Sequence, residues 1–460
     1  MAKRRYEIDM TSGPLAGKIL SFAMPLMLTG ILQLLYNAAD MIVVGNFGSK
    51  TSLAAVGSTG ALINLIVNVF MGLSVGASVV VAKAIGSGDT EKASRATHTA
   101  VFISLISGVG VGVFGVLMAR TLLTWMGSPD DVIELSTLYV KIYFAGLPAT
   151  MLYNFGAAIL RAMGDTKRPL YFLSLSGIIN VGLNLLLVIV FKLDVAGVAI
   201  ATVASTTVSA VLVTVCLAKT DGCCKLYFRK LKISKNELWE IAKVGLPAGI
   251  QGSIFSISNV LIQSSVNSFG SMTMSGNAAA ANLEGFVWTA MNSIYQAALT
   301  FTGQNMGAGK YKRVRAVCAW CLIIVCAIGI LSGMFVFLFR NTLIGIYDSD
   351  PDIIAEGAKR TAVIAVTYAI CGAMDVMVGM MRGMGKSIVP MIVSIFGVCG
   401  IRIIWIYTVF AQFHSLFWLY YSYPISWVVT LFVHILCFEI MKRKLPKEDI
   451  PTKENARSAQ

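Results

Sequence analysis

A ten-residue stretch that occurs twice in the chain is the main guide to its fold. The sequence LRAMGDTKRP at residues 160–169 returns as MRGMGKSIVP at residues 381–390, an offset of 221. The sequence AIGSG at residues 84–88 returns as NMGAG at residues 305–309 with the same offset. A constant offset at places this far apart predicts two halves with the same fold.

The composition around these stretches is that of a membrane protein. Of the 460 residues, 56% are hydrophobic and 13% are charged, whereas a soluble globular chain has about 25% charged residues. The mean hydropathy is +0.75. So few charges exclude a water-soluble surface for a chain of this size, and nine Cys in 460 residues exclude a disulfide scaffold. The remaining class is an all-α membrane protein with several spans.

Apolar segments of the length that a bilayer core requires, about 20 residues, occur six times in each half. The twelve predicted spans are residues 19–47, 54–85, 97–126, 132–160, 169–192, 194–218, 239–268, 277–306, 316–346, 353–381, 388–411 and 414–441. Because six is even, we expect both halves to share one orientation, related by a pseudo-two-fold axis along the membrane normal. The expected organisation is an N-terminal lobe at residues 1–218 (helices 1–6), a basic cytoplasmic linker at residues 219–238, and a C-terminal lobe with a cytoplasmic tail at residues 239–460 (helices 7–12).

The basic excess of the chain indicates its orientation in the membrane. The formal net charge is +14, and most Lys and Arg fall in segments that are cytoplasmic if the N-terminus is cytoplasmic. This asymmetry follows the positive-inside rule and indicates no nucleic-acid partner. The outer segments hold only Lys50, Arg120, Lys141, Lys192, Arg340, Lys359 and Arg360. We therefore expect both termini to be cytoplasmic.

Three acidic residues lie well inside the predicted spans, namely Asp40, Glu284 and Asp375. An ionised carboxylate at that depth costs several kcal/mol, so such residues face a polar pathway, bind an ion or carry a proton. The alternative is a buried ion pair or a hydrogen bond between helices. None of the three acids is duplicated in the other half, where the equivalent residues are Ile262, Ile63 and Asn154.

Polar residues around Asp40 predict an ion site in the first lobe. Gln33, Tyr36, Asn37 and Asp40 have the spacing i, i+3, i+4 and i+7, which places them on one face of a helix. Oxygen ligands suit a small hard cation such as Na⁺, and the same carboxylate can instead take a proton. If their helices are neighbours, the converging residues are Asp40, Asn180, Asn184 and Thr202. For the Asn pair, hydrogen bonding between helices is an equal alternative.

The second lobe offers a site for an organic cation. Glu284, Trp288 and Asn292 share a helix face, and a carboxylate beside an indole suits a cation through charge and cation–π contact. Ordinary packing of Trp288 is the alternative. Glu284 and Asp375 lie about 10 Å from opposite membrane edges, so a direct contact between them does not follow from the sequence. The partner of Arg402 is either Asp375 or backbone carbonyls. The residues expected to line a substrate cavity are Gln33, Tyr36, Asn37, Asn154, Gln251, Asn259, Trp288 and Asn292.

Several stretches, taken in order, are similar to one known family. They are AMPL at residues 23–26, QLLYNAAD at 33–40, VVGNFG at 43–48, GQNMGAG at 303–309 and SYPISW at 422–427, together with the two Arg-x-Met-Gly segments. The chain resembles the MATE (multidrug and toxic compound extrusion) family, bacterial type, over nearly its whole length.

The resemblance implies a fold and a function. The fold is the V-shaped MATE/MOP-superfamily arrangement of two six-helix bundles with a central cavity. The function is export of cationic or amphipathic organic compounds in exchange for inward H⁺ or Na⁺. Asp40 is then a coupling residue beside Asn180, Asn184 and Thr202, and Glu284 and Asp375 resemble the acids of other branches. Position 184 is often Asp in the family but is Asn here, and a span-seven acid is missing near Phe255 and Ser256. Which ion drives transport, H⁺ or Na⁺, and which lobe binds that ion therefore stay open.

We interpret the chain as a secondary active multidrug antiporter of the bacterial cytoplasmic (inner) membrane. It should need no cofactor beyond the coupling H⁺ or Na⁺, act on small organic cations, and function in the lipid bilayer as a monomer. One alternative is a lipid-linked saccharide flippase, which calls for more bases inside the spans than Arg402. A membrane-embedded enzyme is disfavoured because the three histidines, His98, His414 and His434, occupy separate regions. A channel is disfavoured by the lack of a filter or a charged ring.

Overall fold

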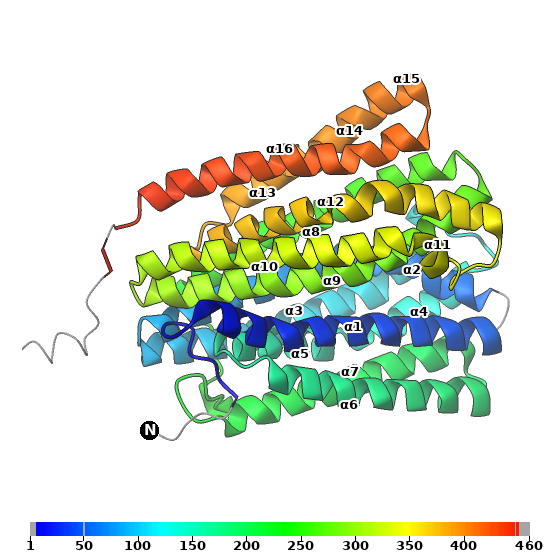
Figure 1. Ribbon diagram of the computed structural model, residues 1–460. Helices are drawn as coiled ribbons and strands as arrows, with labels where there is room; N and C mark the ends of the chain where they lie inside the picture. The colour runs from blue at the N-terminus through cyan, green and yellow to red at the C-terminus, as the bar shows by residue number, and fades with distance from the viewer. Residues whose placement is uncertain (1–5, 49–50, 447, 450–460) are drawn as a thin grey trace, which may run out of the picture. The chain divides into compact units, whose positions relative to one another are not determined.

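The computed structural model describes residues 6–48, 51–446 and 448–449, and over these ranges the chain is helical with no strand. Figure 1 shows long helices joined by short turns. This confirms the all-α prediction. Lys50, counted above among the outer charges, and the basic residues close to both ends of the chain lie outside the described residues.

Each of the twelve predicted spans is occupied by helix. Within the described residues, ten helices are long and apolar enough to cross a membrane. The pair α4 (Ile133–Ala145) and α5 (Leu147–Ala162), bent by 48°, brings the number to eleven if it counts as one span. The remaining segment is the 37-residue helix α9 (Ser271–Gly307), which carries Glu284 and many Asn, Gln, Ser and Thr side chains. The chain is a multi-pass membrane protein.

The helices group into two compact units. The first consists of Met1–Asp9 and Leu28–Gly249. Within it, α5 contacts α2, α3 and α7, so α5 forms the centre of this unit. Besides α4, α5 and parts of α1 (Leu15–Phe47) and α8 (Lys235–Asn267), it contains α2 (Ser52–Gly86), α3 (Thr90–Trp125), α6 (Lys167–Asn184), the π-helical η1 (Leu185–Val190), α7 (Asp194–Lys219) and the short η2 (Phe228–Lys230).

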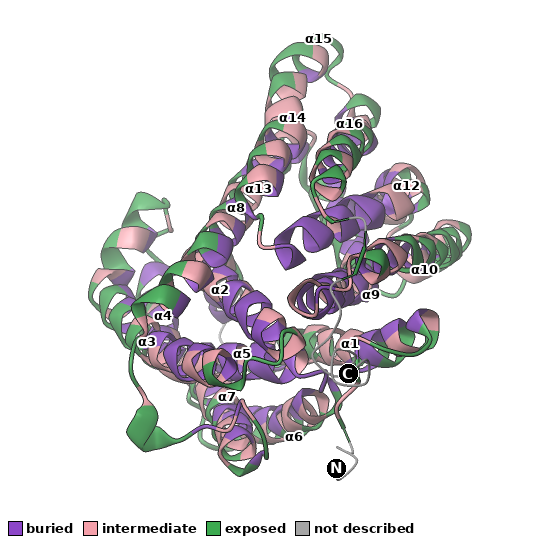
Figure 2. Cartoon of the chain, turned by 90° about the vertical axis from the view of Figure 1, so that its left-hand side faces the viewer, coloured by how far each residue is buried: buried purple, intermediate pink, exposed green. Residues whose placement is uncertain are grey.

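The second unit consists of Met10–Met27 and Ile250–Gln460. Its centre is α12, which contacts α9, α10 and α16, and Figure 2 shows α9 and α12 buried along much of their length. Its helices after α9 are α10 (Tyr311–Leu338), α11 (Arg340–Ile344), α12 (Pro351–Gly383), α13 (Ile388–Ser394), the π-helical η3 (Ile395–Gly400), α14 (Ile401–Trp405), the π-helical η4 (Ile406–Phe410), α15 (Ala411–Phe413) and α16 (Leu416–Arg443).

The internal repeat reappears as backbone geometry. Gly88, between α2 and α3, has φ +70°, and Gly309, between α9 and α10, has φ +68°. Gly164, between α5 and α6, has φ +91°, and Gly385, between α12 and α13, has φ +83°. A residue with a Cβ is strained in this left-handed region, whereas glycine adopts it freely. The repeated glycines therefore specify the same turns in both halves of the chain.

Residues 10–27 and 219–249 are grouped differently in the contact units than in the lobes that the repeat predicts. The two lobes therefore stay a prediction. The first difference has a simple cause. The carbonyl of Met10 accepts hydrogen bonds from Asn305 Nδ2 and Arg313 Nε, both at 3.1 Å. The ring of Phe22 meets Phe301 edge-on at 5.7 Å between centroids. Residues 10–27 are thereby attached to the second unit.

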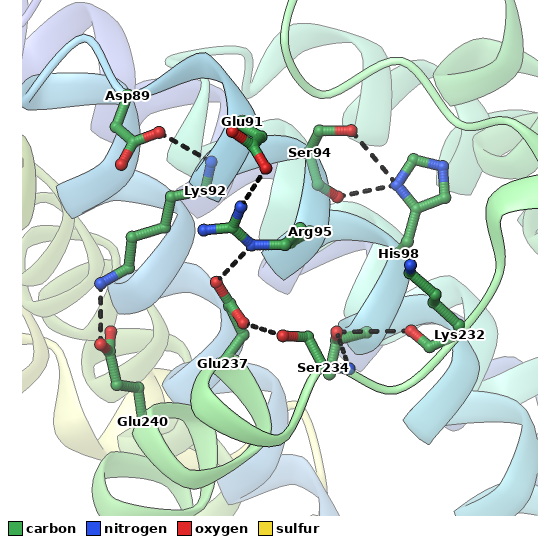
Figure 3. A network of polar contacts seen from close by, with 11 residues as sticks. Asp89, Glu91, Lys92, Ser94, Arg95, His98, Lys232, Ser234, Glu237 and Glu240 are labelled. Atoms are coloured by element: carbon green, nitrogen blue, oxygen red, sulfur yellow. Dashed lines mark hydrogen bonds and ion pairs between the residues drawn. The ribbon is translucent and has the colours of Figure 1, made fainter.

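The second difference arises from polar contacts between the linker region and α3 (Figure 3). Glu237, at the start of α8, accepts from Arg95 Nε at 2.9 Å, and Glu240 accepts from Lys92 Nζ at 2.7 Å. Earlier in the linker, the backbone N–H of Tyr227 meets His98 Nε2 at 3.0 Å. The segment expected to be a basic linker is thus fastened to the first unit.

Candidate functional site

Asp40 in α1 meets side chains of α6 and α7 within the first unit. Asn184 Nδ2 donates to Asp40 Oδ1 and, at 3.2 Å, to Asn180 Oδ1. Thr202 Oγ1 donates to Asp40 Oδ2 at 3.3 Å. The structure thus brings together all four residues for which the sequence predicts an ion site.

The Asp40 site holds a carboxylate whose partners are all neutral. Within the described residues, no Lys, Arg or His pairs with Asp40. The buried Oδ1 of Asn184 has no hydrogen-bond partner among the same residues. A buried acceptor without a donor costs free energy, and oxygens from a carboxylate, an amide and a hydroxyl are ligands that a hard cation prefers. The geometry can therefore accommodate one added positive charge, either a proton on Asp40 or a small cation.

Tyr36 lies one turn before Asp40 and packs against α6. Its hydroxyl donates to the carbonyl of Ser174 at 3.4 Å. A Cβ built on Gly177 would lie only 1.7 Å from Cζ of the Tyr36 ring. The ring therefore occupies the space that a side chain on Gly177 would need, and this contact sets the register of α1 against α6 next to the ion site.

We predict that Gly177→Ala destabilises the protein by about 1–3 kcal/mol, the usual cost of overpacking. The displaced Tyr36 should also shift Asp40 and lower transport. Gly182, on the same helix, has open space around its would-be Cβ, so Gly182→Ala is the matched control and should be neutral or slightly stabilising. Thermal unfolding in detergent measures both variants, and equal melting temperatures would contradict the prediction.

Glu284 in α9 forms a buried ion pair with Arg360 in α12. Arg360 Nε donates to Glu284 Oε1 at 2.8 Å, and Arg360 Nη2 donates to Oε2 at 2.6 Å. Arg360 Nη1 donates to Asn277 Oδ1 at 2.9 Å. Arg360, counted above with the charges of the outer side, is 7% exposed and is not a surface charge. Both carboxylate oxygens of Glu284 therefore already accept hydrogen bonds from the guanidinium of Arg360.

Asp375 and Arg402 do not pair. Asp375 is half-buried in α12 and makes no hydrogen bond or ion pair within the part of the chain that the structure describes. Arg402 in α14 donates from Nε to Ser426 Oγ at 3.1 Å. We expected the partner of Arg402 to be either Asp375 or backbone carbonyls. Both alternatives are wrong, because the partner is the hydroxyl of Ser426.

The remaining residues expected at a substrate cavity differ in their burial and in their hydrogen-bond partners. Gln251 is buried and accepts from Arg382 Nη2 at 2.8 Å, while Asn154 is half-buried and donates to the Thr150 carbonyl at 2.8 Å. Trp288 is 48% exposed although Glu284, one turn earlier, is buried. Of the others, Asn292 is half-buried, and Gln33, Asn37 and Asn259 are exposed.

Two groups of polar residues escaped the sequence analysis. Arg360 is 76 residues from Glu284, so no local spacing could reveal the pair. Tyr423, Ser426 and Trp427 surround Arg402. Their spacing of i, i+3 and i+4 on one helix face is a signal that could have found them.

Comparison with protein families places these sites in a known fold. The MatE family model matches residues 25–186 and again residues 247–408, so two copies at an offset of 222 cover most of the chain. The chain belongs to the MatE family. MatE proteins are membrane transporters, and the resemblance to the MATE family noted in the sequence is confirmed. The chain is therefore a membrane transporter and not an enzyme.

Individual MatE relatives are distant but extend over nearly the whole chain. The probable multidrug resistance protein YpnP of Bacillus subtilis is 27% identical, over 84% of this chain and 86% of its own. An FAD transporter of Shewanella oneidensis is 23% identical, over 79% of this chain and 81% of its own. A solved structure of a MOP superfamily transporter from Pyrococcus furiosus matches with a TM-score of 0.90 at 23% identity, over 95% of this chain and 98% of that chain. This likeness confirms the fold.

Proposed function

We propose that this MatE protein is a secondary active antiporter that exports cationic or amphipathic organic compounds in exchange for inward H⁺ or Na⁺. One observation carries the proposal. Asp40 is a carboxylate inside a membrane-spanning helix, and within the described residues its partners are the neutral side chains of Asn184 and Thr202. An ionised carboxylate at such a depth is expensive unless a cation or a proton neutralises it. Asp40 is therefore the group that should bind the coupling ion.

Both ions suit the chemistry of the Asp40 site. A proton would neutralise the carboxylate and keep it as an acceptor for the Thr202 hydroxyl. Sodium would need several oxygens, and the carboxylate of Asp40 together with the partnerless Oδ1 of Asn184 supplies two kinds of them. Asn180 Oδ1 accepts one hydrogen bond and keeps a second lone pair. In this role the ion is transported and is not a resident cofactor.

Coupling requires that ion and cargo favour different states of the transporter. Binding of H⁺ or Na⁺ at Asp40 from outside would favour the inward-facing state and weaken the binding of cargo. Cargo bound from the cytoplasm would reverse that preference. A ligand shifts such an equilibrium only by its difference in affinity for the two states. A single neutralisable carboxylate among neutral partners offers such a difference.

Relatives and charge distribution support the remaining parts of the proposal. The relative YpnP is named a probable multidrug resistance protein, which supports a drug-like organic cargo. The basic residues concentrated in one set of loops support cytoplasmic termini, and relatives such as YpnP of Bacillus subtilis support a bacterial inner membrane location. Each chain carries its own Asp40 site, so we propose that a monomer suffices.

The proposal predicts gradient-driven efflux from liposomes that contain the purified protein. The liposomes are loaded with a fluorescent organic cation, and an inward gradient of H⁺ or of Na⁺ is imposed, one at a time. We expect one of the two gradients to accelerate loss of dye, and an ionophore that collapses that gradient should abolish the acceleration. If neither gradient accelerates loss of dye above that of protein-free liposomes, the antiporter assignment fails.

A further inference from the structure

Among its described residues the second unit buries three arginines, and they differ in what neutralises them. Arg360 is bound by the carboxylate of Glu284. Arg382 donates to Tyr295 Oη at 2.6 Å and to Gln251 Oε1 at 2.8 Å. Arg402 is 5% exposed, and its one hydrogen bond within the described residues joins Nε to Ser426 Oγ at 3.1 Å. Of the three, Arg402 has the fewest acceptors.

The free end of the Arg402 guanidinium is its pair of terminal nitrogens. Neither nitrogen makes a hydrogen bond to any part of the chain that the structure describes. Neither belongs to the fully buried side-chain atoms that lack a partner, so both keep some access to the molecular surface. These nitrogens are the pair that forms a two-pronged contact with a carboxylate or a phosphate. These two donors are thus unused within the described residues.

Aromatic rings and Ser426 hold this guanidinium in place. Arg402 Cζ lies 4.1 Å from the centroid of the Tyr423 ring and 5.8 Å from that of Trp427. Ser426 Oγ donates to the Tyr423 carbonyl at 2.8 Å, so the lone pair that faces Arg402 accepts from Nε. Cation–π contact and one hydrogen bond orient the group but leave its charge in place. Arg402 is therefore positioned without being neutralised.

The charges around Tyr423 do not balance. Arg360 Cζ also lies over this ring, 5.3 Å from its centroid, and its charge is matched by Glu284. Arg402 has no carboxylate partner within the described residues, so the cluster carries one uncompensated positive charge. Burying a charge without a partner opposes folding, whereas a bound anion would remove that penalty.

The backbone around Arg402 is also irregular. α14 has five residues and lies between the π-helical segments η3 and η4. In the first unit, the π-helical η1 begins directly after Asn184 of the Asp40 site. π-Helical turns are rare in proteins overall, and those that occur are often found at functional sites. In each half of the chain they adjoin a buried polar residue with unused hydrogen-bonding capacity.

We propose that Arg402, oriented by Ser426, Tyr423 and Trp427, binds the carboxylate or phosphate group of an aromatic organic molecule. The terminal guanidinium nitrogens donate two parallel hydrogen bonds to two oxygens of the anion, and the rings contact its apolar part. As a statement about cargo, the assignment rests on the proposed function. It adds that accepted compounds include zwitterions and anions, with the acid group held in the second unit.

Equilibrium binding to the purified full-length protein tests the Arg402 site without any ion gradient. The probes are benzoate for a carboxylate and phenyl phosphate for a phosphate, with benzyltrimethylammonium and benzyl alcohol as cationic and neutral controls, all at constant chloride. We expect at least one of the two anions to raise the melting temperature and to bind in calorimetry, and benzyl alcohol not to do so. Any shift caused by benzyltrimethylammonium reports the cation binding of the proposed function and should persist when Arg402 is replaced. If both anions leave the wild-type protein unchanged, the proposal is overturned.

Substitutions at Arg402 assign the binding to this side chain. Arg402→Gln should abolish the anion-induced shift and raise the Kd about tenfold or more, as expected for loss of charged hydrogen bonds. Arg402→Lys keeps the charge but not the two-pronged geometry, so it should fold normally and bind with an intermediate Kd. Arg443→Gln, which removes an exposed charge at the end of α16, is the matched control and should bind as the wild type does.

The outcomes separate the Arg402 site from the antiporter. Wild-type affinity in both Arg402 variants would overturn the site. Absence of anion binding combined with gradient-driven efflux of an organic cation would overturn the site and leave the proposed function intact. Anion binding that depends on Arg402, in a protein that no gradient drives, would support the site and overturn antiport.

Discussion

Asp40→Asn is expected to lower gradient-driven efflux by about 5- to 150-fold, the range of typical coupling free energies between two sites. Asn has nearly the shape of Asp and can still accept from the Thr202 hydroxyl, so the packing of α1 should survive. It cannot take up a proton, and it offers no negative charge to Na⁺. The gradient should therefore no longer bias the transporter, although cargo can still bind. Dye efflux from liposomes under the effective gradient measures the loss.

Two further variants make the Asp40 experiment specific. Asp131→Asn removes an exposed acid from the turn before α4 and should leave efflux unchanged. Asp375→Asn removes the half-buried acid of the second unit and shows whether that unit contributes to coupling. Wild-type coupled efflux in both Asp40→Asn and Asp375→Asn would refute the role assigned to the acids inside the spans.

Glu284→Ala is expected to lower the free energy of unfolding by about 3–5 kcal/mol, the usual cost of removing one partner of a buried ion pair. Arg360 would keep its hydrogen bond to Asn277 but lose both carboxylate contacts, and its charge would be left in a buried environment. Exposed pairs contribute much less, about 0–1 kcal/mol. Thermal unfolding of the purified protein in detergent measures the effect.

A double substitution and an exposed pair complete the Glu284 test. Glu284→Leu combined with Arg360→Met removes both charges and should restore most of the lost stability, because replacing a buried pair with apolar residues is often neutral. Arg120 and Glu134 form a pair at 2.8 Å whose side chains are 66% and 68% exposed, so Glu134→Ala is the matched control with a small effect. If Glu284→Ala keeps the wild-type melting temperature but loses coupled efflux, Glu284 is a coupling residue and not a structural one.

Much of the fold follows from local properties of the sequence. Apolar segments of membrane length predict the helices, since the bilayer leaves few other ways to satisfy the backbone. The repeated glycines are a second local property: Gly88 and Gly309 take the same left-handed turn because both turns need a residue without a Cβ. The stripe from Gln33 to Asp40 was also readable, because residues with helical spacing share a face before any partner is known.

The partners of the buried charges did not follow from the sequence. Asp40, Glu284 and Arg402 are all visible as charges within spans, but their spacing says nothing about helices far away in the chain. Packing of α9 against α12 neutralises Glu284 with Arg360, and packing of α14 against α16 gives Arg402 a hydroxyl and two rings. These two packing contacts therefore make Glu284 and Arg360 a buried ion pair and leave Arg402 without a carboxylate partner within the described residues.

The amino-acid sequence was enough to establish the class of the protein, its two-fold repeat, the positions of its helical segments and the few polar positions inside them. Hydropathy, chain length and turn chemistry act over a few residues, so they can be read along the chain. Which of those polar positions are neutralised, and by what, depended on the folded molecule. Charge compensation in a low-dielectric interior acts between atoms a few ångströms apart, and only the packing of distant helices decides which atoms those are.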